Sequence, residues 1–354
     1  MDFQCTILTV GTNFPRFVTL SGSNHIRNAD EMNSHRAGLY HHTRHRDHVA
    51  GLPIIEHHIA QTGPGAPETV SIIACGLDII VGRALLEPKL TLHMVLHRDW
   101  LFFMLPLSWK GDYIFNGNVA SPNDMFVAPT GNGYATVSEM RDNIGFGIRK
   151  RRLKSVMRHL SGRGDDSFPL HDQRVALNEA QGRSLRCKFL LAIEASRAKP
   201  LSPGRCLLSE VLENDLICSV ANVLLAHSAD SAPEVRGHIS SLEVIRAAQL
   251  AYTAKPPHLV SLEDLCSAAG VGQAWLHKCF VEIYGIPPMG FLRAYRLREA
   301  RSRILDTVSP PRSIKEVALA LGFFNGGRFA ADYRALFSEN PAETLARNVK
   351  QMHS

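Results

Sequence analysis

The chain lacks the short motifs by which many enzymes are recognised. It contains no P-loop, no GxGxxG phosphate-binding loop, no GxSxG nucleophile and no HExxH zinc motif. Its seven cysteines are odd in number and include no CxxC pair, which argues for reduced thiols rather than a disulfide framework. These absences count against the commonest catalytic classes and against a disulfide-stabilised secreted domain.

Long apolar segments are also missing. No run approaches the roughly 18 apolar residues that a membrane-spanning helix needs. The N-terminus shows no basic region followed by an apolar one, so we expect no signal peptide and a cytoplasmic location. The 354 residues are 45% hydrophobic and 20% charged, as in soluble proteins of two or three domains. A formal charge of +6 suits a polyanionic partner without demanding one.

The C-terminal part of the chain contains the same pattern twice. Ser261 and Ser313 each precede an acidic residue by three positions, Asp264 and Glu316, and we expect a capping box at both. Each short helix then meets a glycine that can end it in the left-handed conformation. A second helix with apolar inner positions follows. Two helix-turn-helix motifs are therefore predicted, at about 261–284 and 313–337.

A further helix is expected between the two motifs, in "PMGFLRAYRLREARSRILD". It begins behind Pro287, where proline suits a helix start. About eighteen helical residues span roughly 27 Å. Such a rod could hold two recognition helices about one DNA turn, roughly 34 Å, apart on one side of a duplex. The alternative is an ordinary pair of helical hairpins in an all-α bundle.

Residues 241–347 resemble the DNA-binding domain of the AraC/XylS family of transcription regulators. The resemblance rests on "GFLRAYRLREARSRIL" as the connecting helix and on "SIKEVALALGF" and "GRFAADYRALFSENPAETL" as the second motif, in the form of the ethanolamine-operon type. Two positions depart from the family pattern. Ser338 stands where glycine is usual, and Gly272 stands where serine usually caps the first recognition helix.

The outer faces of the second helix of each motif are expected to contact DNA. We assign Trp275, Leu276, Cys279 and Phe280 to the inner side of the first recognition helix. The alternative for Lys278 is a solvated surface charge. Arg328 is expected to make most of the base contacts of the second recognition helix. Arg334 is expected to contact a phosphate or the solvent. The full set of expected DNA contacts is Gln273, Ala274, His277, Lys278, Asn325, Gly326, Gly327, Arg328, Ala331 and Arg334. Arg293, Arg296 and Arg298 are candidates for further backbone contacts, and the favoured alternative for each is an ordinary surface arginine.

The N-terminal part is typical of a β-rich domain. Short apolar runs such as "LTLHMVLH", "WLFFMLPL" and "DMFVAPT" are broken by Gly, Pro, Asn and Asp. The stretch "GDYIFNGNVASPNDMFVAPTGNGY" reads as strand, turn, strand and turn, and it resembles the cupin-like β-sandwich that many family members use as a sensory domain. A histidine-rich segment raises the alternative of a metal cupin, but its members crowd into one polar stretch. These residues are His41, His42, His45, His48, His57 and His58, with Glu56. We expect no metal and no other cofactor.

Two helical regions are expected after the strands. "IRKRRLKSVMRHL" predicts a basic amphipathic helix that either packs on the sandwich or faces DNA or an anion. "CLLSEVLENDLICSVANVLLAH" has an apolar stripe too wide for a lone surface helix. The family resemblance implies that such helices pair two subunits. Residues 228–240 are then the expected linker.

The sequence thus predicts an α+β protein: a cupin-like sensory domain at 1–165, a helical dimerisation region and linker at 166–240, and a double helix-turn-helix domain at 241–354. We expect a non-enzymatic, sequence-specific regulator, an activator by resemblance, that reads two successive major grooves. Its implied partners are promoter DNA, RNA polymerase, a small-molecule effector and a second copy of the chain, with no membrane. The alternatives are a metal-dependent cupin-type enzyme with an appended DNA-binding module and a non-specific architectural protein. The architectural protein is disfavoured. Residues 241–354 carry fourteen Lys or Arg against ten Asp or Glu, and this modest positive excess is too small for purely electrostatic DNA binding.

Overall fold

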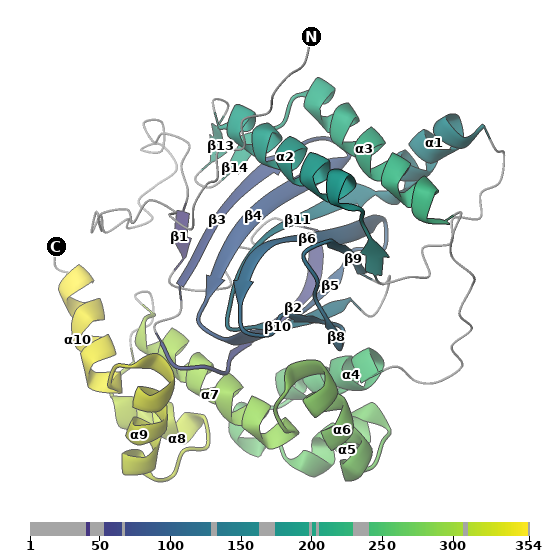
Figure 1. The fold of residues 1–354 in the computed structure, drawn as a ribbon. Coiled ribbons are helices and arrows are strands. Elements are labelled where there is room, and N and C mark those ends of the chain that lie inside the picture. Colours follow the sequence, from purple (N-terminus) through teal and green to yellow (C-terminus); the bar gives the residue numbers. More distant parts are fainter. Residues whose placement is uncertain are drawn as a thin grey trace.

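The computed structural model describes residues 40–42, 53–65, 68–128, 133–162, 174–197, 200–202, 205–228, 241–306 and 311–352. All described strands precede residue 208, and only helices follow residue 240. Two β-sheets with three covering helices lie above the group of C-terminal helices (Figure 1). The α+β class, with an N-terminal sandwich and an all-α C-terminal part, is therefore confirmed.

The larger sheet has nine strands in the order β12-β9-β6-β11-β4-β3-β14-β13, with β1 paired to β3. Neighbouring strands are antiparallel except β14, which runs parallel to β3. Its strands are β1 (Tyr40–His42), β3 (Glu68–Cys75), β4 (Ile79–Glu87), β6 (Trp100–Lys110), β9 (Asp124–Ala128), β11 (Met140–Arg149), β12 (Arg174–Ala176), β13 (Pro200–Ser202) and β14 (Arg205–Leu207).

The smaller sheet has five strands in the order β2-β5-β10-β7-β8. They are β2 (Ile54–Gln61), β5 (Leu90–Leu96), β7 (Ile114–Phe115), β8 (Asn118–Val119) and β10 (Tyr134–Ser138). Side chains alternate across each strand, and the fold uses both faces. In β2, Ile59 packs between the two sheets, whereas the next residue, Ala60, packs against the C-terminal helices.

Three helices cover the outer face of the larger sheet: α1 (Lys150–Ser161), α2 (Glu179–Ser196) and α3 (Glu210–Ser228) (Figure 1). They share one apolar core with the strands beneath them. Leu153, Val156 and Met157 form the buried side of α1, so this basic helix packs on the domain. Leu191 of α2 and Val211 of α3 are well exposed.

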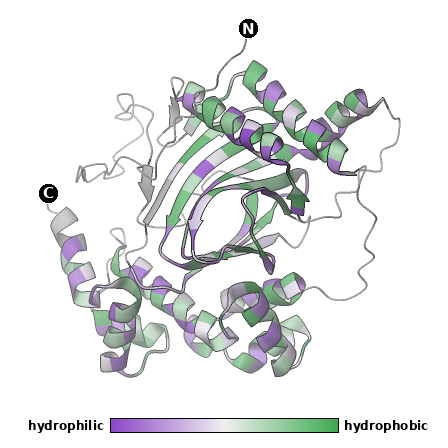
Figure 2. Ribbon diagram, in the orientation of Figure 1, coloured by the Kyte–Doolittle hydropathy of each residue, from purple (hydrophilic) through white to green (hydrophobic). Residues whose placement is uncertain are grey.

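The C-terminal part consists of seven α-helices and one short 3-10 turn among the described residues. They are α4 (Ser241–Ala254), η3 (Pro257–Leu259), α5 (Leu262–Ala269), α6 (Gln273–Tyr284), α7 (Pro288–Ile304), α8 (Ile314–Ala320), α9 (Gly326–Phe337) and α10 (Pro341–Met352). Most residues of the sandwich strands are apolar, whereas these helices combine apolar (green) and polar (purple) residues (Figure 2). The helices contain two cores, and α7 contributes to each of them.

The smaller sheet and the C-terminal helices are packed together. Ala60, Ala135 and Val137 of the sheet belong to the same buried cluster as the helices of the first motif. Polar contacts join the two parts as well. Arg246 of α4 donates to Glu56 at 2.6 and 3.1 Å.

Strand β2 also contacts the second motif. The Nε2 of Gln61 donates to the carbonyl oxygen of Leu336 at 2.8 Å, and the backbone N–H of Gly65 donates to the same oxygen at 2.9 Å. Leu336 lies at the C-terminal end of α9, so this sheet reaches both helix-turn-helix motifs.

Some of the residues that the sequence analysis named lie outside the described residues. This applies to His45 and His48, to most of the expected linker (229–240), and to the side chains of His41, His42 and His57. Among the helices that are described, none combines the length and apolar character that crossing a bilayer requires.

Candidate nucleic-acid interface

The first helix-turn-helix motif is built by local capping. The Ser261 hydroxyl accepts from the backbone N–H of Asp264, whose carboxylate accepts from the N–H of Ser261, so the expected capping box is present. Gly270 ends α5 at φ 65°, in the left-handed region that favours glycine. Gly272 then starts α6 without a side-chain cap. The turn that aims α6 is thus fixed mainly by backbone conformation.

The outer face of α6 carries all four of its expected contact residues. Gln273, Ala274, His277 and Lys278 are exposed, while Leu276, Cys279 and Phe280 are buried. The assignment of Trp275 to the inner side is wrong, because its side chain is 42% exposed. The buried stripe follows 276, 279, 280 and 283, and position 275 lies just outside it.

Trp275 and Lys278 form a pair on this outer face. The Nζ of Lys278 lies 4.9 Å from the centroid of the Trp275 ring, within cation–π range. The ring therefore presents a flat apolar surface beside a positive charge. Sequence reasoning missed Trp275 as a candidate contact, although its helical position alone contained the signal.

The second motif repeats this design with different caps. Ser313 accepts from the backbone N–H of Glu316 at 3.1 Å, but no bond returns from the carboxylate to Ser313. The full capping box expected there is therefore wrong, and only its forward half forms. Gly322 has φ 82° and follows the end of α8. Asn325 caps α9 by accepting from the N–H of Arg328 at 2.9 Å.

The outer face of α9 is small and exposed, as the sequence indicated. Its exposed expected contacts are Asn325, Gly326, Gly327, Arg328, Ala331 and Arg334. A Cβ atom added at Gly326 would meet nothing within 4 Å, so no described neighbour requires glycine there. Phe324, in the turn just before α9, is 80% exposed. It is a second apolar candidate that the sequence reasoning did not single out.

The electrostatics of the helix starts distinguish α6 and α9 from α5 and α8, the first helices of the two motifs. The first turns of α5 and α8 contain acidic residues, whereas those of α6 and α9 contain none. A helix N-terminus carries partial positive charge and exposed N–H groups that suit phosphate. An acid in the first turn would repel that phosphate, so the starts of α6 and α9 suit a polyanion better than those of α5 and α8.

The arginines of the connecting helix α7 have internal roles. Arg293 pairs with Asp332 of α9, and Arg296 donates to the carbonyl oxygen of Val260 at 3.1 Å. Arg298 donates to the carbonyl oxygen of Ile59 at 3.1 Å, across to strand β2. The expectation that these three supply further DNA backbone contacts is untested, and their bonds instead fix α7 against its neighbours.

A buried ion pair holds the end of the second motif. The side chain of Arg301 is 7% exposed, lies 3.1 Å from the carboxylate of Glu339 and stands over the ring of Phe337. Arg347 of α10 reaches the same carboxylate at 2.8 Å. Burial works to raise the pKa of Glu339, but bonds from Arg347 and Thr344 and the charge of Arg301 outweigh it and lower that pKa.

The described residues contain no group of three or more His, Cys, Asp or Glu arranged to hold a metal ion. His58 and His93 stack with ring centroids 6.1 Å apart on neighbouring strands. Glu56 is engaged by Arg246, whose hydrogen bond lowers the pKa of that carboxyl despite partial burial. The carboxylate of Glu56 therefore joins the smaller sheet to the C-terminal helices.

Comparisons with known proteins agree with this geometry. A helix-turn-helix domain model matches residues 265–347. The XylDLEGF operon transcriptional activator 1 of Pseudomonas putida is 39% identical over 88 residues, which are 25% of this chain and 27% of that protein. The probable thc operon regulatory protein of Rhodococcus erythropolis is 25% identical over 173 residues, which cover 49% of this chain and 48% of that protein.

A solved structure is also similar. A probable AraC family transcriptional regulator from Rhodopseudomonas palustris CGA009 is 32% identical, with a TM-score of 0.28; the match covers 30% of this chain and 96% of that one. The chain spans only about a quarter of the length of the first P. putida regulator. Residues 265–347 therefore match a helix-turn-helix domain, and a stretch of 88 residues is similar to a transcriptional activator of P. putida.

Proposed function

We propose that the protein is a sequence-specific DNA-binding transcription regulator that inserts α6 and α9 into two successive major grooves. The observation that carries the proposal is the paired motif itself. Both second helices present an exposed outer face and an acid-free first turn. Helix α7, of 17 residues, joins them and is about 26 Å long, which is comparable with one turn of DNA.

The two recognition helices divide the readout between polar and apolar contacts. Arg328 is the main candidate for a bidentate contact to guanine, and Lys278 and Gln273 can reach base edges or phosphates. Trp275 and Phe324 add exposed apolar surfaces, which suit thymine methyl groups. Arg334 lies about two turns into α9, where a phosphate contact is expected.

Regulation is proposed to come from the sandwich. The relatives in P. putida carry the word activator in their names, and activation with contact to RNA polymerase is proposed here by analogy. An effector within the sandwich would act through β2, which contacts α4, α7 and α9. The exposed Leu191 and Val211 make α2 and α3 the proposed pairing face of a homodimer. The second motif is assigned to the ethanolamine-operon-like subgroup on its sequence alone, and no enzymatic activity is assigned.

The test is selection of DNA by the purified full-length protein from fragmented genomic DNA at physiological salt. Two conserved blocks about ten base pairs apart are expected. Arg328→Ala should remove the preference at one block while leaving the other. Arg312→Ala is the control, since Arg312 is exposed and lies outside both recognition helices. Retention without any motif, in the presence and absence of cell extract, would overturn the proposal.

A further inference from the structure

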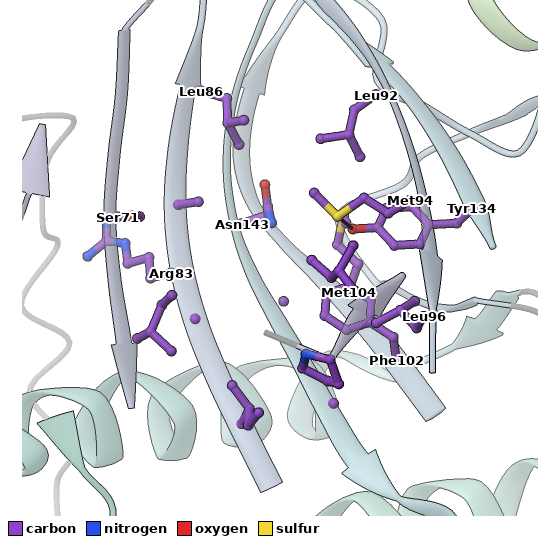
Figure 3. A pocket seen from close by; sticks show the side chains of 18 of the residues that line it. Ser71, Arg83, Leu86, Leu92, Met94, Leu96, Phe102, Met104, Tyr134 and Asn143 are labelled. Carbon is purple, nitrogen blue, oxygen red and sulfur yellow. Dashed lines mark hydrogen bonds between the residues drawn. The ribbon is translucent and has the colours of Figure 1, made fainter. Parts of the chain in front are cut away.

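A cavity of about 70 Å³ lies inside the sandwich, between the two sheets. Its wall is mainly apolar, with Leu92, Met94 and Tyr134 from the smaller sheet and Leu86, Phe102 and Met104 from the larger one (Figure 3). A water needs about 10–15 Å³ by this measure, so the space equals about five to seven waters. That volume suits a compact organic molecule rather than a sugar nucleotide or a long chain.

Arg141 of β11 lines this cavity and is unusual in its surroundings. The residue is only 1% exposed. One terminal nitrogen donates to the Ser138 hydroxyl at 2.7 Å, and the guanidinium lies 5.7 Å from the centroid of the Tyr113 ring. Its Nε is buried without a hydrogen-bond partner. Within the described part of the chain, no carboxylate forms an ion pair with it. A buried charge normally has an opposite charge beside it.

The neighbouring tyrosines do not supply that negative charge. Burial raises the pKa of Tyr113 to about 12, although the charge of Arg141 acts to lower it. Burial raises the pKa of Tyr134 as well. Both phenols are therefore neutral near pH 7. The contact with Tyr113 is a cation–π contact, and neither phenol supplies the negative charge that Arg141 lacks among the described residues.

The other arginine at the cavity is already neutralised. Arg83 donates to both carboxylate oxygens of Asp142, at 3.1 and 2.6 Å. Among the described residues, the cavity therefore holds one positive charge without an opposite charge, which calls for one negative charge from a ligand. Asn143 is a second polar group in the wall, and its Oδ1 is buried without a partner.

We propose that this cavity binds a compact, apolar monocarboxylate whose carboxylate pairs with Arg141. This inference rests on the proposed function, because it names the chemical class of the effector. The apolar body of the acid lies against Met94, Met104 and Tyr134, and its charge fills the missing place beside the guanidinium. A planar carboxylate matches the fork of donors on arginine. A neutral analogue would leave the buried charge unpaired.

The position of the cavity connects it with the DNA-binding part. Leu92 and Met94 of β5 form its wall, and β2, paired with β5, contacts the C-terminal helices through Glu56, Ile59 and Gln61. A ligand between the sheets is thus separated from these contacts by a single layer of strands. Binding of the acid changes the packing of that layer and with it the support of α7 and α9.

The test measures binding to the full-length protein by calorimetry, with three acids and their neutral amides as probes: cyclohexanecarboxylate, phenylacetate and hexanoate. At least one acid is expected to bind about ten- to a hundredfold more tightly than its amide. Arg141→Met should remove this preference, and Arg141→Lys should keep part of it. Arg149→Met is the matched control, since Arg149 lies on the same strand but outside the cavity wall.

Three results would overturn the inference. They are equal binding of acid and amide, no binding of any of the six probes, or unchanged acid binding by Arg141→Met. The wild-type comparison of acid with amide stands even where a variant does not fold. DNA selection with the same preparation separates the two proposals. A DNA motif without acid preference removes only the inference, whereas loss of the DNA motif removes the proposed function.

Discussion

The ion pair between Glu56 and Arg246 should measurably stabilise the contact between the smaller sheet and the C-terminal helices. The two side chains are 17% and 31% exposed and meet through two hydrogen bonds of 2.6 and 3.1 Å. Buried charge-assisted bonds contribute about 1.5–3 kcal/mol, and exposed pairs about 0–1 kcal/mol. For this partly buried pair we expect a coupling free energy of about 1–2 kcal/mol.

The assay is a double-mutant cycle with Glu56→Gln, Arg246→Met and both changes together, followed by urea unfolding. The pair also predicts a pH dependence. The hydrogen bond from Arg246 lowers the pKa of the Glu56 carboxyl below 4.5. The stabilisation is therefore complete above pH 4.5 and is lost as the pH falls through the lowered folded-state value. A coupling free energy under about 0.3 kcal/mol at pH 7, or one unchanged at low pH, would refute the reasoning.

Three further predictions concern single side chains. Arg83→Met should lower the free energy of unfolding by about 3 kcal/mol, because it leaves Asp142 buried and unpaired. Arg141→Met should cost little. If thermal unfolding shows the same loss of stability for both variants, this reasoning is contradicted. Ser338→Gly should stabilise by about 1 kcal/mol, since Ser338 has φ 56°, and an unchanged unfolding midpoint would count against it. Arg334→Ala should weaken cognate and random DNA alike and reduce the salt slope by about one; loss confined to cognate DNA would reassign Arg334 to base readout.

The helix-turn-helix motifs could be predicted closely because their boundaries depend on neighbouring residues. Capping at Ser261 and Asn325 involves partners three positions away, and the sequence contains that information directly. The error at Trp275 came from assigning a side to a residue at the edge of the buried stripe. The missing return bond at Ser313 shows that a favourable pattern permits a capping box without forming it.

The sandwich could be predicted only as a class. Strand β14 pairs with β3 across more than one hundred residues, with Cys206 opposite Ala74, and no local pattern specifies such a partner. It also lies in a region that the sequence indicated as helical. The charge of the cavity could not be predicted from the sequence either, because nothing in the sequence distinguishes Arg83 from Arg141. Only the fold shows that Asp142 neutralises one and that no described carboxylate neutralises the other.

The shared core between the smaller sheet and the first motif has a consequence for how the chain unfolds. Ala60, Ala135 and Val137 complete a cluster otherwise formed by C-terminal helices, so neither half keeps its full apolar interior alone. A fragment starting at residue 241 would expose that face to water and would tend to associate through it. The two halves should therefore lose structure in one cooperative transition, and a change that loosens the sandwich also lowers the free energy of unfolding of the first motif.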